Sequence, residues 1–209
     1  MKSQVLKIML TSLLAPAALL AAIINPRQNS AGVATVDLSK RTGQASFLGS
    51  GFIYGFPDNG RDADNSIPDH FLTDIQFRTC RAGGAQIAAE GWATGGEEGY
   101  QGRFDSTLSN YRTTRKYNGD FILLPHDIWG AQGGAPESFP FPGDDGDWSE
   151  MEAFLRRLIA DVKANDMLPG LVIDLWNEPD LDGFWNRPWS QYVEYYVRAS
   201  KLLRYPTLV

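Results

Sequence analysis

The chain has 209 residues, a formal net charge of −6 and a sequence pI near 4.9. Its Lys and Arg residues form no cluster, which argues against nucleic acid as a partner. The single cysteine, Cys80, excludes an intrachain disulfide, so the fold must depend on its apolar core.

The first 24 residues follow the plan of a secretory signal peptide. Lys2 and Lys7 precede an apolar stretch that runs from Ile8 to Ile24. We therefore expect a secreted, extracellular protein with no stable membrane association after cleavage. A signal anchor is the alternative, although the stretch is near the short limit for crossing a bilayer at about 1.5 Å per residue.

Residues 25–50 form a polar lead-in in which Val33–Asp37 predicts a short strand. Two strand and helix units follow. Phe52–Phe56 predicts a buried strand and is followed by a Gly/Asp/Asn-rich loop and a helix that opens at Pro68. Phe77–Arg81 predicts the second strand, and the Gly-rich segment after it carries Gln86 before a polar helix over 106–116.

Two further units complete the pattern. Phe121–Leu124 predicts a third strand, whose carboxyl end displays His126, Asp127 and Trp129. Asp147 and Glu150 have the spacing of a capping box at the start of an amphipathic helix. The aliphatic run Leu171–Leu175 predicts a buried parallel strand, and a last helix starts near Pro188.

Strand and helix thus alternate four times, which indicates an α/β fold with a parallel sheet. A complete (β/α)8 barrel of the TIM type typically needs about 250 residues. We therefore expect residues 51–209 to form about the first four βα units of such a barrel, as its N-terminal half.

The fourth predicted strand leads into Trp176-Asn177-Glu178-Pro179. Chemistry in such barrels lies at the carboxyl ends of the strands, so Glu178 is a candidate acid/base group. Asn-Glu-Pro also occurs as a plain turn into a helix. Its position after an aliphatic strand, in a chain with four βα units, favours the catalytic interpretation.

The motif Leu175–Asp180 resembles the acid/base motif of retaining glycoside hydrolases with (β/α)8 barrels. With the strand Phe77–Arg81 before its Gly-rich turn and the Gly51-Phe52 opening, the chain is most similar to glycoside hydrolase family 39, roughly from Ser50 to Leu203. The resemblance implies a secreted O-glycosyl hydrolase acting on poly- or oligosaccharide glycosides, with a carbohydrate substrate and no metal or organic cofactor.

The resemblance also implies roles for single residues. Glu178 is the general acid and then the base, Asn177 binds the sugar 2-hydroxyl, and Trp176 supplies an apolar wall. The remaining candidates for substrate binding are His126, Asp127, Trp129 and Gln86. His126 and Asp127 have a plainer interpretation as a hydrogen-bonded pair that ends a strand.

A retaining enzyme needs a second carboxylate roughly 5 Å from the first. Glu90, Asp127 and Asp174 are the strand-end carboxylates available, and none fits the nucleophile, which in the family follows the seventh strand. We therefore expect this chain to be inactive by itself. The alternatives are a non-catalytic carbohydrate-binding remnant, or a dimer that rebuilds a barrel from two halves.

Overall fold

A computed structural model describes residues 35, 37, 39–40, 43 and 50–204. Contacts divide the chain into two compact units, residues 1–44 and 45–209. In the first unit, Asp37 accepts hydrogen bonds from the backbone and hydroxyl of Ser39, which closes a short exposed turn. The predicted signal peptide lies outside the described residues, as does most of the strand predicted over Val33–Asp37.

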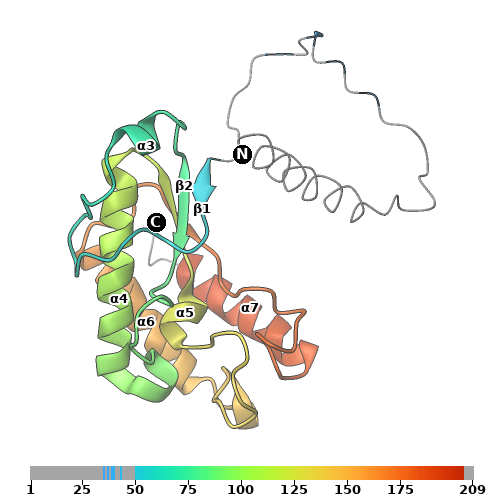
Figure 1. The fold of residues 1–209 in the computed structure, drawn as a ribbon. Coiled ribbons are helices and arrows are strands. Elements are labelled where there is room, and N and C mark those ends of the chain that lie inside the picture. Colours follow the sequence, from blue (N-terminus) through green and yellow to red (C-terminus); the bar gives the residue numbers. More distant parts are fainter. Residues whose placement is uncertain (1–34, 36, 38, 41–42, 44–49, 205–209) are drawn as a thin grey trace, which may run out of the picture. The chain divides into compact units, whose positions relative to one another are not determined.

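The second unit alternates strands and helices, as Figure 1 shows. Its elements are β1 (Gly51–Phe52), α3 (His70–Thr73), β2 (Thr79–Ala82), α4 (Trp92–Lys116), β3 (Asp120–Leu123), α5 (Pro125–Trp129), η1 (Asp144–Gly146), α6 (Ser149–Ala164), β4 (Leu171–Ile173) and α7 (Trp189–Arg204). Among the described residues, no helix has both the length and the apolar character that a membrane span requires.

The four strands form one parallel sheet in the order β1-β2-β3-β4. Cys80 of β2 pairs with Phe52 on one side and with Phe121 on the other. Each crossover between neighbouring strands contains a helix, as parallel pairing requires. The predicted α/β class with a parallel sheet is confirmed.

The sheet has one covered and one open face. Cys80 and Ala82 of β2 and Phe121 and Leu123 of β3 are buried beneath the helices. Side chains alternate along a strand, so the residues between them point the other way. On that open face Val172 of β4 is exposed, and Arg81 and Ile122 are only half-buried. The apolar core therefore lies between the sheet and its helices.

Helix α4 is the largest departure from the sequence prediction. A helix was expected only over 106–116, but α4 begins at Trp92 and its backbone kinks at Gly96. The hydroxyls of Thr107, Thr113 and Thr114 donate to carbonyls four residues earlier, which satisfies polar groups in a buried helix. The part that was not predicted, residues 92–105, contains four glycines, which are poor helix formers.

The starts of two other helices also differ from expectation. The residues expected to be displayed at the carboxyl end of the third strand belong to the short helix α5, which opens at Pro125 and contains His126 and Asp127. The predicted capping box does not form: Trp148 is the N-cap of α6, and Asp147 accepts the backbone N–H of Ser149 at 2.8 Å. Its expected partner, Glu150, instead accepts from the Trp92 indole.

Three of the four strands are shorter than predicted, and β3 has the predicted length. β1 ends at Phe52, although the apolar run continues to Phe56, because Gly55 has a φ of 82° and the chain turns. Phe56 then packs against Phe77 in the core. β4 likewise ends at Ile173. The apolar runs indicated where each strand lies but not the residue at which its pairing ends.

Candidate functional site

The carboxyl ends of the strands surround a cavity of about 460 Å³. Its polar lining comes from segments far apart in sequence: Arg81, Gln86, His126, Asp127, Asn177 and Glu178. Parallel strands deliver their following loops to the same edge of a sheet, which explains the convergence. The structure thus brings together five of the seven residues singled out from the sequence.

Arg81 organises the centre of this cavity. It points from the open face of β2, where its Nε and Nη2 lie 2.9 and 2.8 Å from Asp174 Oδ2. Its Nη2 also donates to Asn177 Oδ1 at 3.0 Å. The ion pair holds the Arg81 guanidinium in place, and the bond to Oδ1 sets the orientation of the Asn177 amide. Arg81 therefore determines which atoms of Asn177 face a ligand.

Glu178 continues the same chain of hydrogen bonds. Asn177 Nδ2 donates to Glu178 Oε2 at 3.1 Å, and the Glu178 side chain is otherwise exposed at the mouth of the cavity. The backbone of Glu178 has a φ of 42°, a left-handed conformation that a non-glycine residue adopts at a cost. The turn therefore holds this carboxylate in a position that ordinary backbone geometry does not provide.

Two buried neighbours on α5 line the inner wall. Burial raises the pKa of Asp127 to about 6, although the charges of Arg103 and Arg81 oppose that rise. Burial also lowers the pKa of His126 to about 3, and the same two arginines add to the effect. Both side chains are thus held toward their neutral forms.

His126 lacks the hydrogen bonds that its burial calls for. Nε2 lies 3.2 Å from Asp127 Oδ1, but the geometry is not that of a hydrogen bond. Neither ring nitrogen has a partner among the described residues. An orphaned buried imidazole at a cavity wall is available to a polar ligand group.

Gly83 allows α5 to approach the sheet. A Cβ at Gly83 would lie 2.3 Å from the carbonyl oxygen of Leu124 and 2.6 Å from Asp127 Cβ. Any larger residue would push Asp127 out of the cavity wall. The Gly-rich turn after the second strand is thus a packing requirement.

Trp176 and Trp129 do not line the cavity. Trp176 is buried, donates its indole N–H to the Phe184 carbonyl at 3.0 Å, and stands behind His126 with ring centroids 5.5 Å apart. Trp129 is also buried and donates to the Pro140 carbonyl at 3.1 Å. Both rings support the site from the core. They do not form the apolar wall or the stacking surface expected of them.

Gln86 is at the cavity, but its amide is partly committed. Its Nε2 donates to the Ser106 hydroxyl of α4 at 3.0 Å. The side-chain oxygen has no hydrogen-bond partner in the described part of the chain and remains free to accept one.

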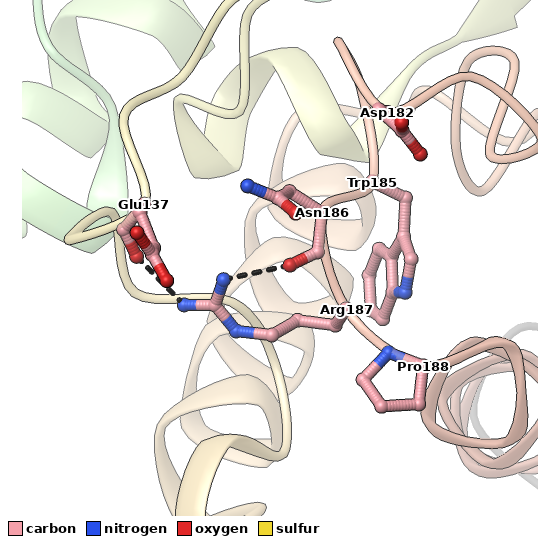
Figure 2. Close-up of a pocket in the computed structure, with 6 residues that line it drawn as sticks. All are labelled: Glu137, Asp182, Trp185, Asn186, Arg187 and Pro188. Atoms are coloured by element: carbon pink, nitrogen blue, oxygen red, sulfur yellow. Dashed lines mark hydrogen bonds between the residues drawn. The ribbon is translucent and has the colours of Figure 1, made fainter.

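A second hollow of about 500 Å³ lies apart from Glu178 and is lined by Glu137, Asp182, Trp185, Asn186, Arg187 and Pro188. Figure 2 shows the Arg187 guanidinium bonded to the backbone carbonyls of Asn186 and Glu137. Arg187 also binds Asp144 with N–O distances of 2.7 and 2.9 Å. Its donors are committed to loop contacts, so this hollow is structural.

Sequence reasoning missed Arg81 as the organiser of the site. The available signal was the alternation along the strand: Arg81 lies between Cys80 and Ala82, which are both buried, and so must point to the opposite face. Asp174 has the matching position just after β4. An arginine and a carboxylate on one face of a parallel sheet, with one strand between them, are candidates for an ion pair.

Within residues 50–204 and the few described before them, no three His, Cys, Asp or Glu side chains gather in a way that could hold a metal ion. Comparison with family models, with curated proteins and with solved structures found no match to this chain.

Proposed function

We propose that this chain carries the acid/base half of a retaining O-glycosyl hydrolase site, built on the first four units of a (β/α)8 barrel and related to glycoside hydrolase family 39. The observation that supports this most is the hydrogen-bonded series Arg81, Asn177 and Glu178 at the mouth of the 460 Å³ cavity. A polysaccharide or oligosaccharide glycoside is the proposed substrate class.

The strand order supports a barrel over a doubly wound sheet. The order β1-β2-β3-β4 contains no reversal. A doubly wound sheet reverses its strand order and covers both faces with helices. Here one face of the sheet is open, and Val172 on that face is exposed. In a barrel, the corresponding face lines the interior and carries no helices.

Glu178 is suited to the proton transfers that glycoside cleavage needs. As general acid it protonates the departing glycosidic oxygen, and as general base it then takes a proton from water. Arg81 occupies Asn177 Oδ1, and Asn177 Nδ2 keeps one N–H for a sugar hydroxyl beside Glu178. The amide can hold that hydroxyl without changing its own charge.

The second carboxylate is the missing part. Among the described residues, Asp127 is the only carboxyl group besides Glu178 that lines the cavity. Burial holds the pKa of Asp127 near 6, which makes it a poor nucleophile at lower pH, and it is enclosed by α5. We therefore expect weak or no turnover by this chain. Ligand binding is the first test.

The test uses the full chain and two probes of matched size, a neutral oligosaccharide and a basic iminosugar, in titration calorimetry. The protonated amine of the iminosugar should pair with Glu178, so Glu178→Gln should weaken iminosugar binding at least about tenfold, which is about 1.4 kcal/mol. Asp180→Asn, at an exposed carboxylate two residues away, is the matched control and should change neither affinity.

Three results would decide the matter. Glu178-dependent binding of the iminosugar, or Glu178-dependent cleavage of aryl glycosides, supports the acid/base role. Saturable binding of both probes that Glu178→Gln leaves unchanged favours the carbohydrate-binding remnant instead. Absence of binding by either probe, with no cleavage, contradicts both.

A further inference from the structure

The sheet ends in two open edges of different composition. β1 pairs only with β2, and β4 pairs only with β3, so each outer strand has backbone groups without a strand partner in the described part of the chain. Exposed apolar side chains accompany each edge: Ile53 just after β1 and Val172 in β4. Open parallel edges of this kind are templates for further pairing.

Helix α7 extends the edge beside β4. Trp189, Val193 and Tyr196 are 57, 45 and 48% exposed and follow the i, i+4, i+7 spacing of one helix flank. Arg198 projects from another flank, toward Glu152 and Trp148 of α6. The apolar flank of α7 therefore differs from the flank that contacts α6. We call Val172, Trp189, Val193 and Tyr196 the β4/α7 edge.

The segment around α3 extends the opposite edge. Asp69 at the start of this helix bonds Lys116 of α4 at 2.8 Å, which identifies the flank that faces α4. Phe71 and Ile75 lie on a different flank and are 58 and 46% exposed. We call Ile53, Phe71 and Ile75 the β1/α3 edge.

The two edges are complementary in direction and charge. The single turn α3 leads into β2 and bonds Lys116 at the end of α4, which leads into β3, so α3 lies near the amino ends of the strands. In a βα unit the helix after a strand runs back toward the amino ends of the strands, and we infer this direction for α7, which follows β4. Their last residues thus lie at the same end of the sheet. There the acidic Asp74 ends α3 and the basic Arg204 ends α7. A β4/α7 edge set against a β1/α3 edge pairs apolar flanks along the helices and opposite charges at their ends.

We propose that a second copy of this chain occupies both edges. The β4/α7 edge of each copy packs against the β1/α3 edge of the other, and these two equal contacts close around a two-fold axis. The product is an eight-stranded parallel sheet, the strand number at which a barrel interior is just filled by side chains. The exposed Ile53 and Val172 become interior residues, and both copies' cavities open at the same end.

Each copy carries both a β4/α7 edge and a β1/α3 edge, so two copies cover all four edges. A second copy therefore fits better than an unrelated protein. The inference depends on the sheet and its edges, and not on the glycosidase proposal. Its readout is molecular mass, which needs no sugar and no turnover.

Sedimentation velocity of the full chain over a range of micromolar concentrations is the first experiment. The expected species has twice the mass of one chain. Val193→Glu on α7 and Phe71→Glu on α3 should each give monomers with unchanged circular dichroism, because both positions are already exposed. Ser190→Glu, an exposed position on a different side of α7, should remain dimeric.

Mixing the two variants tests which edge meets which. Each defective dimer has two damaged contacts, whereas a mixed dimer has one intact contact and one doubly altered contact. Mixing should therefore restore part of the dimer. If Val193→Glu alone prevents association while Phe71→Glu does not, α7 pairs with α7 and the proposal is wrong.

A charge exchange gives an independent measurement. Asp74→Arg and Arg204→Asp should each weaken the dimer at low salt, and the double variant should recover it by restoring opposite charges. A native chain that remains monomeric at all concentrations contradicts the proposal. So does a dimer that none of these substitutions affects.

Discussion

Glu178 combines the position of a functional group with an unfavourable backbone. Its φ of 42° belongs to the left-handed region, which costs an L-residue roughly 1–2 kcal/mol relative to glycine. Such outliers persist where the surrounding structure holds them, and they are enriched at functional sites. The turn thus trades stability for the placement of a carboxylate.

Glu178→Gly should for this reason stabilise the chain, by about 1 kcal/mol, while removing Glu178-dependent ligand binding. Urea unfolding followed by circular dichroism measures the change. Asp180→Gly, at a position without a positive φ, should be neutral or destabilising. If both variants lose stability equally, the Glu178 backbone is not strained.

His126 and Asp127 have opposite effects on the pH dependence of stability. The pKa of Asp127 is raised to about 6, so the folded state binds its proton earlier than the unfolded state and gains stability as pH falls from 6 to 4. The pKa of His126 is lowered to about 3, so the unfolded state binds that proton first and the folded state loses stability as pH falls below 6.5. The two effects nearly cancel between pH 4 and 6.

Single substitutions should separate these effects. In Asp127→Asn, the free energy of unfolding should fall by about 3 kcal/mol between pH 6 and 4, because only His126 remains. In His126→Gln, it should rise by a similar amount over the same range. Denaturant titrations at several pH values measure both slopes, and parallel slopes in the two variants would contradict the assignment.

At the scale of elements, Arg187 fastens the long loop between α5 and α6 to the start of α7. Its guanidinium donates to the Glu137 and Phe139 carbonyls, each at 3.1 Å, and to Asp144. Gln191 of α7 adds bonds to Pro142 and Asp144. This anchor fixes a loop that has only the 3-10 turn η1 as regular structure.

Arg187→Ala should cost about 2 kcal/mol of stability, because several bonds to a charged donor are lost and Asp144 is left without its ion pair. Thermal unfolding provides the measurement. Arg156→Ala, at an exposed arginine of α6, should have almost no effect. Equal losses in the two variants would mean that the loop does not depend on Arg187.

The sequence predicted those elements whose packing requires apolar residues at a regular spacing or in a continuous run. The apolar residues Phe154, Leu155 and Leu158 recur at helical spacing in α6, and the aliphatic run from Leu171 marks β4. The first part of α4, residues 92–105, was not predicted because it contains Gly95, Gly96, Gly99 and Gly102, and glycine is a poor helix former that usually marks a loop. The predicted part carries the buried polar residues Ser106, Thr107 and Asn110, whose burial is tolerated because tertiary contacts and backbone carbonyls satisfy them.

Several residues of the site could be predicted from the sequence, but the burial of their side chains could not. Asn177 and Glu178 lie at the cavity because a strand delivers them there. The burial of Trp176 and Trp129 could not be read from sequence, since an aromatic residue after a strand suits either a core or a sugar surface. The partnership of Arg81 with Asn177 depends on the register of three strands.

At the scale of the whole molecule, the sheet is stable at its centre and open at its rims. β3 is paired on both sides, so the amides of Phe121 to Leu123 should exchange with solvent at least about tenfold more slowly than those of Gly51 and Phe52. Hydrogen exchange read by NMR tests this. If two copies associate, protection of β1 should rise with protein concentration while that of β3 does not.

Cys80 lies at the middle of this sheet, fully buried, with burial raising its pKa to about 12. A thiol in that state is protonated and shielded from alkylating reagents at neutral pH. The extent of its alkylation therefore measures the fraction of molecules whose sheet has opened, and no added reporter is needed. A fluorophore can also be attached at a single engineered surface cysteine of the second unit, because the native thiol stays silent until the molecule unfolds.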